Sequence, residues 1–312
     1  MALPFLRPGR GDGALHLPQR SYGTFEQWLL VLGLAYLLVF AGIPLFYNLL
    51  MSFQEMDAMA PGAWWSRPWV GLDNYIDVLQ RPEARGVWLN TGLFIALSLL
   101  FQVVLGFGLA LLFQEAFLGA TVMRGLFLAG WIMPGLVAGV VWKLLFAGDY
   151  GVLNHVLLQL GLVRESIYWL SDARYALYAV IIANVWLGVP FNMLLLSAGL
   201  AQIPRDLYEA AELDGANAWQ RFTSITLPMM ASTLGAVIAL GVIMTIQQFD
   251  LVAALTQGGP ANASQLAQHW SWQLSFQTFE VASGSAIASL MLVVVVATAV
   301  VYVRATRRER LV

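Results

Sequence analysis

The side chains of this chain that could do chemistry are neutral hydrogen-bonding groups set among aromatic rings. They occur in otherwise apolar stretches, where Asn184, Thr245 and Gln248 are clear examples. Polar groups at such depth are costly when they face lipid and useful when they line a pathway. Amides and hydroxyls beside aromatic rings suit a neutral solute with many hydroxyl groups, whereas an ion would require a carboxylate or an arginine.

The same residues have a simpler interpretation, because small and amide side chains also join helices within membranes. Solute binding and helix packing both remain open on this pattern. Three of the apolar stretches contain such polar, small or aromatic residues, and none of these residues is charged. They are Trp131, Pro134, Gly135, Asn184, Trp186, Gly188, Pro190, Phe191, Asn192, Gly241, Thr245, Gln247 and Gln248.

Other chemistry is not indicated. The sequence has no cysteine, and the spacing of His16, His155 and His269 does not suit a metal site. It has no Walker-type G-x-x-x-x-G-K-S/T sequence, so we expect no ATP hydrolysis by this chain, and no convergent titratable groups that would indicate another enzyme. A net charge of −2 without a basic stripe argues against nucleic acid as a partner.

The elements that must position these groups are membrane helices. Of the 312 residues, 59% are hydrophobic and 11% are charged, against about 25% charged in soluble domains. Six apolar stretches can cross a hydrocarbon layer, which needs about 20 residues. The sequence therefore predicts an all-α polytopic membrane protein with six transmembrane helices, over residues 28–50, 91–113, 125–146, 175–199, 229–249 and 281–303.

The basic residues predict the orientation. We expect a cytoplasmic tail over residues 1–24, a membrane domain over 25–304 and a second cytoplasmic tail over 305–312. With both termini in the cytoplasm, ten of the 16 lysines and arginines fall on the inner side, as the positive-inside rule requires. Lys143 and Asp250 fall near the outer ends of their spans, where they could gate the outer mouth or simply extend to the interface. Between the third and fourth spans, the segment Gly151 to Leu162 is too short to cross the membrane and is predicted to be a short interfacial helix.

Between the fourth and fifth spans lies a polar segment, residues 203–226, which we call the hairpin. Its six charges make burial in the membrane unlikely. Pro204 suits a first helical position, and Gly215 can supply the left-handed residue that ends the helix. A second short helix is expected from about Asn217. The small pair Ala210 and Ala211 would let another protein surface approach the helix backbone.

The hairpin carries a specific resemblance. Glu209-Ala210-Ala211, three residues, Gly215, nine residues, Ile225, one residue and Leu227-Pro228 match the "EAA" motif of ABC-importer membrane subunits in residue type and spacing. In that family the motif forms a coupling helix that docks in a cytoplasmic ATPase subunit. The resemblance implies a type I permease fold and assigns ATPase coupling to Leu207, Tyr208, Glu209, Ala210, Ala211, Asp214 and Gly215.

The fourth and fifth spans resemble the sugar-importer branch, and in particular the larger, sugar-contacting membrane subunit of maltose-type transporters. The motif Asn184 to Phe191 and the later Leu255-Thr256-Gln257-Gly258-Gly259-Pro260 carry this similarity. Several residue types differ from the maltose pattern, so another sugar or glycoside is open. Positions that match sugar contacts of the family are Trp131, Gly135, Asn184, Leu187, Gly188, Phe191, Gly241, Thr245 and Gln248.

The resemblance implies a subunit of an ATP-driven importer in a bacterial or archaeal cytoplasmic membrane. Its partners would be a second homologous permease, a cytoplasmic ATPase dimer that binds Mg-ATP, an extracytoplasmic solute-binding protein, the sugar and the lipid bilayer. No cofactor is expected in this chain. An ion-coupled secondary carrier of a neutral polar solute is the alternative, but it predicts buried carboxylates and an internal repeat, which we do not find.

Overall fold

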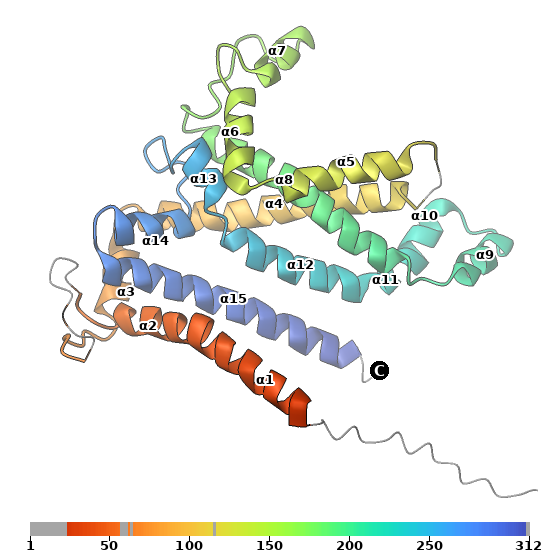
Figure 1. Ribbon diagram of the computed structural model, residues 1–312. Coiled ribbons are helices and arrows are strands. Elements are labelled where there is room, and N and C mark those ends of the chain that lie inside the picture. The colour runs from red at the N-terminus through yellow and green to blue at the C-terminus, as the bar shows by residue number, and fades with distance from the viewer. Residues whose placement is uncertain (1–23, 57–61, 63–64, 115–116, 310–312) are drawn as a thin grey trace, which may run out of the picture. The chain divides into compact units, whose positions relative to one another are not determined.

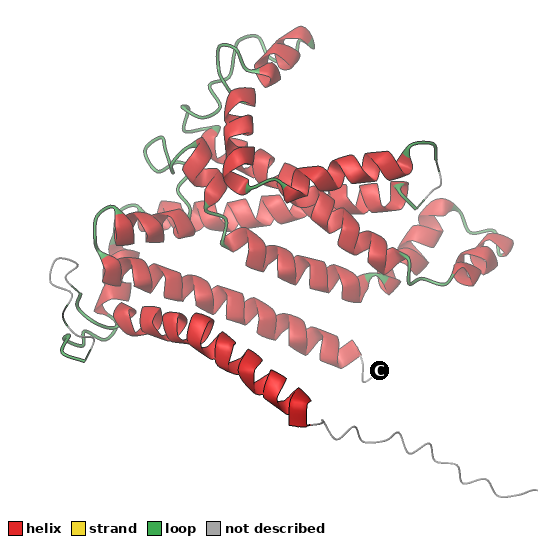
Figure 2. Cartoon of the chain, in the orientation of Figure 1, coloured by secondary structure: helices red, strands yellow, loops and turns green. Residues whose placement is uncertain are grey.

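The computed structural model describes residues 24–56, 62, 65–114 and 117–309. Most of the predicted N-terminal tail, residues 1–23, and the last three residues of the predicted C-terminal tail lie outside the described part. Helices form the regular elements of the described residues (Figure 2), and one isolated antiparallel bridge joins Gln54 and Trp69. This agrees with the predicted all-α class.

The chain forms two compact units, Met1–Tyr47 and Asn48–Val312. The first unit contains α1 (Thr24–Leu37), the π-helical turn η1 (Leu38–Gly42) and the start of α2 (Ile43–Ser52). These segments form one apolar helix, Phe25–Ser52, which is long enough to cross a membrane and contains the predicted first span.

The second unit contains three more helices of membrane-spanning length: α4 (Ala84–Leu112), α8 (Ala176–Leu200) and α15 (Val281–Glu309). Two pairs of bent helices also qualify if each pair counts as one span. The described residues therefore contain four continuous candidate spans and up to six in all, which fits the six predicted. The last helix continues beyond residue 303, the predicted end of its span, into part of the predicted tail.

The predicted third span is broken in the middle. Instead of one helix over residues 125–146, the structure has α5 (Ala120–Ile132) and α6 (Gly135–Leu145), bent by 104° at Met133 and Pro134. Proline has no N–H to donate to the preceding turn, and it forces the residue before it out of the helical conformation. Met133 accordingly has φ −64° and ψ 129°.

The predicted fifth span also departs from a single helix. It is preceded by α10 (Ala218–Arg221), η2 (Phe222–Thr226) and α11 (Leu227–Met229), and the chain bends by 64° before α12 (Ala231–Ile246). Because α12 ends at Ile246, Gln247 and Gln248 lie on a connection to the short helix α13 (Asp250–Leu255). The chain then turns at the Gly-Gly-Pro sequence, where Gly258 has φ +80°.

Shorter helices complete the second unit. A short helix, α7 (Val152–Gln159), lies within the predicted helical segment Gly151 to Leu162, while its place at a membrane interface stays a prediction. Two others, α3 (Asp73–Gln80) and α14 (Ala267–Phe276), lack the length of a span and were not predicted as elements. Arg81, at the end of α3, forms ion pairs with Asp77 and with Glu280, just before α15, and so connects α3 to α15.

The centre of the second unit is the contact between α4 and α8. A Cβ atom on Gly106 of α4 would lie 2.8 Å from Asn192 Cβ and 3.0 Å from the Met193 backbone nitrogen on α8. The absence of a side chain at Gly106 is therefore what allows the two helices to approach. Buried apolar residues of both helices, such as Phe107 and Met193, continue this contact.

We expect Gly106→Ala to destabilise the protein, because overpacking of a close helix contact costs about 1–3 kcal/mol. Gly108→Ala is the matched control, since a Cβ at Gly108 on the same helix meets nothing within 4 Å. The measurement is the thermal unfolding midpoint of the protein in detergent, which should fall for Gly106→Ala and stay equal or rise for Gly108→Ala. Equal midpoints for both variants would contradict this account of the α4–α8 contact.

Candidate functional site

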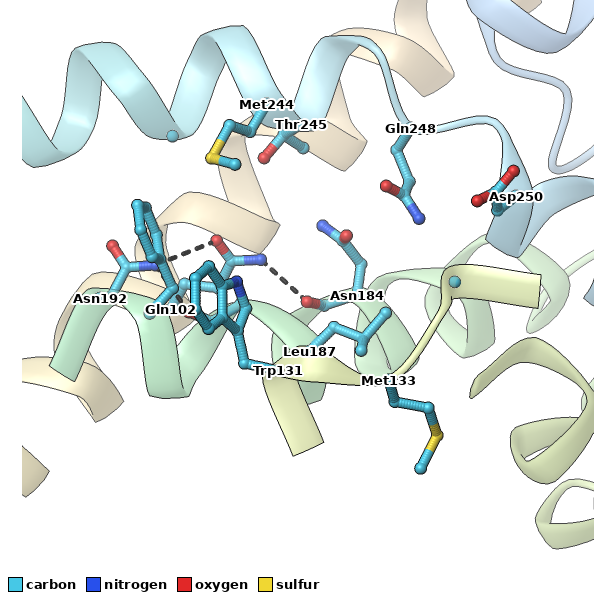
Figure 3. A pocket seen from close by; sticks show the side chains of 14 residues that line it. Gln102, Trp131, Met133, Asn184, Leu187, Asn192, Met244, Thr245, Gln248 and Asp250 are labelled. Carbon is cyan, nitrogen blue, oxygen red and sulfur yellow. Dashed lines mark hydrogen bonds between the residues drawn. The ribbon is translucent and has the colours of Figure 1, made fainter. Parts of the chain in front are cut away.

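A cavity of about 220 Å³ lies within the second unit (Figure 3). Its walls come from α4, α5, α6, α8, α12 and the start of α13, and from the connections between α5 and α6 and between α12 and α13. All nine residues that the sequence analysis assigned to substrate contact line it: Trp131, Gly135, Asn184, Leu187, Gly188, Phe191, Gly241, Thr245 and Gln248. The structure thus brings three distant stretches of sequence together, while contact of these residues with a solute stays a prediction.

One wall of the cavity is aromatic. Trp131, on the last turn of α5, stacks on Phe191 of α8, with ring centroids 5.2 Å apart and an interplanar angle of 20°. Trp131 keeps 39% of its surface exposed. Because the chain turns sharply after Ile132, Gly135 enters the same cavity at the first position of α6. The break at Pro134 is thus what lets both ends of the third span contribute to one site.

Two hydrogen-bonded amide side chains, Gln102 and Asn192, also line the cavity. Gln102 of α4 donates from Nε2 to the backbone oxygen of Asn184 at 2.9 Å, and Asn192 donates from Nδ2 to the backbone oxygen of Gly188 at 2.9 Å. A Cβ on Gly188 would lie 2.3 Å from Gln102 Cδ. Gly188 therefore makes room for the Gln102 side chain. Gln102 was not predicted, although an amide in the middle of the second apolar stretch was a signal for it.

The Asn184 side chain places a buried, unpaired hydrogen-bond donor at the cavity. The residue is 6% exposed, and its Nδ2 atom has no hydrogen-bond partner among the described residues. Figure 3 shows this amide extending toward the side of the cavity from which Gln248 projects. Leaving a buried donor unpaired costs about 1–3 kcal/mol. A hydroxyl that accepted a hydrogen bond here would recover much of that free energy.

Asp250 is a cavity residue that the sequence analysis named only as a possible gate. It lines the cavity and adds a carboxylate to the neutral groups that were assigned to it. A Cβ on Gly135 would lie 3.0 Å from Asp250 Oδ2, whereas Lys143 is exposed on α6 and does not line the cavity. The described residues contain no ion pair between Asp250 and Lys143, so the structure does not join them as one gate.

The position of Asp250 follows from how the chain continues after α12. Because α12 ends early, α13 folds back against α6, and a Cβ on Gly139 would lie 2.4 Å from Ala254 Cβ. Four further cavity residues absent from the predicted contact set are Gln102, Met133, Asn192 and Met244. Gating by Lys143 and Asp250 stays a prediction.

The hairpin lies at one end of the second unit, far from α13 (Figure 1). Its first helix is α9 (Arg205–Leu213), with Pro204 just before it. Gly215 has φ +81°, and two hydrogen bonds close the helix end: Gly215 N–H donates to Glu212 O, and Ala216 N–H donates to Ala211 O. This is the glycine-ended helix that the sequence predicted.

The second part of the hairpin begins with a reciprocal cap. The Asn217 side chain accepts from the Gln220 backbone N–H at 2.9 Å, and the Gln220 side chain accepts from the Asn217 N–H at 2.8 Å. An ion pair between Arg221 and Glu212 ties the two parts together. These contacts fix the turn at Gly215 between two short helical segments.

The hairpin presents a group of exposed side chains, which we call the docking knob. Leu207, Glu209, Ala210, Asp214 and Gly215 are exposed and Ala211 is half-buried, as docking would require. Leu213 and Trp219, which were not predicted as docking residues, are 90% and 70% exposed. Both side chains add exposed apolar area to the hairpin beside the predicted docking residues.

Tyr208 differs from the other predicted coupling residues. It is half-buried, packs against the apolar cluster around Phe107 and Met193, and its hydroxyl lies 2.9 Å from Thr226 Oγ1. Its aromatic ring thus faces the body of the unit, because the tyrosine has apolar neighbours there and a polar partner for its tip. This contact holds α9 against η2.

Known proteins share both the sequence and the fold. Residues 102–310 match the family described as "Binding-protein-dependent transport system inner membrane component". The trehalose/maltose transport system permease protein MalF of Thermococcus litoralis is 34% identical over 283 residues, which are 89% of this chain and 92% of that protein. The diacetylchitobiose uptake system permease protein DasB of Streptomyces coelicolor is 32% identical over 306 residues, 96% and 93% of the two chains.

A solved structure has the same fold. It is a chain of the bacterial alginate ABC transporter in complex with alginate pentasaccharide-bound periplasmic protein. The TM-score is 0.76 at 22% sequence identity, over 91% of this chain and 94% of that chain. Together with the match that covers more than half of the sequence, this likeness establishes that the chain belongs to the family of binding-protein-dependent transport system inner membrane components, with the fold of an ABC-importer permease subunit.

Proposed function

We propose that this chain is a transmembrane subunit of an ATP-driven importer that moves a sugar or sugar-like polyol delivered by a binding protein. The observation that carries the proposal is the cavity, where an aromatic wall faces an unpaired amide and several neutral polar groups. Aromatic rings cover the apolar face of a sugar ring, and amides bond its hydroxyls. The names of the relatives, which refer to trehalose, maltose and diacetylchitobiose, support a sugar.

The hairpin would couple the cavity to a partner that hydrolyses Mg-ATP. Movement of the partner would reach α9 through the exposed knob and the body of the subunit through Tyr208 and the Glu212–Arg221 ion pair. The subunit would alternate between outward and inward access to the cavity together with a second, homologous permease. In this arrangement the hairpin and both termini face the cytoplasm, as the distribution of basic residues suggests.

An ion-coupled carrier is a weaker alternative. The cavity does contain one carboxylate, Asp250, and buried carboxylates serve as coupling groups in such carriers. The family membership argues against this alternative, since its members work with binding proteins. A carrier would also leave the exposed apolar residues of the hairpin without a purpose.

The proposal predicts that Gln248→Ala weakens sugar handling without releasing the ATPase partner. Gln248 lines the cavity, so its loss should raise the sugar concentration for half-maximal uptake several-fold, about what one hydrogen bond of 0.5–1.5 kcal/mol contributes. Gln247→Ala is the matched control, because the neighbouring Gln247 is exposed, does not line the cavity and donates from Nε2 to Ile243 O of α12 at 3.0 Å. Both variants should copurify with the ATPase.

The test is uptake of labelled sugar by proteoliposomes that contain the complete complex. Unchanged uptake by Gln248→Ala across all sugar concentrations would count against this cavity as the sugar site. A similar loss in Gln247→Ala would show that the effect arises from the connection between α12 and α13 and not from the cavity.

A further inference from the structure

The break in the third span places a helix N-terminus inside the membrane domain. α6 has 11 residues and starts at Gly135, which lines the cavity. The first N–H groups of a helix have no partner within it, and the helix dipole adds partial positive charge at this end. Such an end attracts anions, and in transporters with interrupted helices it commonly faces an acidic group of the substrate.

In this chain a carboxylate of the protein already lies at that end. Asp250 Oδ2 would be 3.0 Å from a Cβ on Gly135, and no hydrogen bond or ion pair involves the Asp250 carboxylate within the described part of the chain. Figure 3 shows Asp250 beside the start of α6, at the same side of the cavity as Gln248. The position that an acidic substrate group would take is thus occupied by a fixed negative charge.

No positive side chain offsets this charge at the cavity. Asp250 is the only charged residue among the described residues that line it, and Lys143 is exposed elsewhere on α6. A carboxylate only accepts hydrogen bonds, so it can pair with hydroxyl or ammonium donors of a solute and repels another anion. Asn184 is only 6% exposed, and its side-chain Nδ2 has no hydrogen-bond partner among the described residues. The same cavity therefore also offers a free donor to a polar solute.

We propose that Asp250 is a specificity-determining residue that makes this cavity accept neutral and amino sugars and reject acidic ones. The inference rests on the proposed function, because it refines the substrate class of the same site. It assigns Asp250 a direct role in the cavity, as an acceptor for two neighbouring hydroxyls or one ammonium group.

The experiment uses the purified complex in detergent without its binding protein, which would impose a selection of its own. Three matched probes are titrated by saturation-transfer difference NMR: methyl glucoside, its uronic acid analogue and its 2-amino analogue. We expect the acidic probe to bind about tenfold more weakly than the neutral one, as repulsion between two charges at short range predicts. Asp250→Asn should remove most of this difference and weaken the amino probe.

Glu165→Gln is the matched control, because Glu165 is an exposed carboxylate outside the cavity, and it should leave all three affinities unchanged. Equal binding of the neutral and acidic probes to the unmodified complex would overturn the inference without any variant, so the test does not depend on folding of Asp250→Asn. A difference that persisted in Asp250→Asn would also overturn it. If none of the three probes bound, the proposed sugar site would fail together with the inference.

Discussion

Gly215→Asp should lower ATP-driven uptake strongly while the membrane domain stays folded and inserted. Gly215 has φ +81°, and a Cβ there meets nothing within 4 Å, so the substitution costs only backbone strain of about 1–2 kcal/mol. The new carboxylate would lie beside the exposed Asp214 on the docking knob. Added negative charge at a docked surface opposes association, and we expect uptake to fall more than tenfold.

Gly215→Asn separates charge from backbone geometry. Asparagine tolerates the left-handed conformation and carries no charge, so this variant should retain most uptake and most ATPase binding. The measurements are ATP-driven uptake and copurification of the ATPase for both variants. Uptake by Gly215→Asp that equalled the unmodified protein would refute the assignment of the hairpin as the coupling element.

Gly188→Ala should abolish sugar uptake by a different route. A Cβ at Gly188 would lie 2.3 Å from Gln102 Cδ and 2.3 Å from Gln102 Nε2, so Gln102 would have to leave its hydrogen bond to Asn184 O. We expect loss of sugar binding and uptake together with normal copurification of the ATPase, because the hairpin is not affected. Overpacking of this kind costs about 1–3 kcal/mol, which membrane insertion should survive.

The control for Gly188→Ala is Gly92→Ala on α4, where a Cβ meets nothing within 4 Å. That variant should behave like the unmodified protein in sugar binding and uptake. Normal uptake by Gly188→Ala would mean that the bond between Gln102 and Asn184 is not needed for the shape of the cavity.

The sequence predicted the features that depend on local pattern. Apolar stretches of span length are visible in composition, and the turn at Gly215 follows from the preference of left-handed positions for glycine. The prediction that residues such as Trp131, Asn184 and Gln248 line one site came from the family resemblance. Spacing within a single span does not indicate which helix faces pack together.

The features that the sequence analysis missed depend on tertiary structure. Hydropathy indicates the length of an apolar stretch but not its direction. It therefore predicts one span over residues 125–146 and does not reveal the 104° bend at Pro134. The entry of Asp250 into the cavity was also missed, because α12 ends at Ile246, before the predicted end of the fifth span at residue 249, and α13 packs against α6. The contact of Tyr208 with Thr226 joins positions 18 residues apart, and local sequence pattern does not predict such a contact.

The most direct test of the central claim is the energy source for uptake by proteoliposomes that contain this chain, its partner subunits and a sugar-loaded binding protein. We predict accumulation of the sugar only when Mg-ATP is on the side of the membrane that the hairpin faces and the binding protein is on the other side. An ion gradient alone should give none. Accumulation driven by an ion gradient without ATP, or without any ATPase bound at the hairpin, would contradict the account.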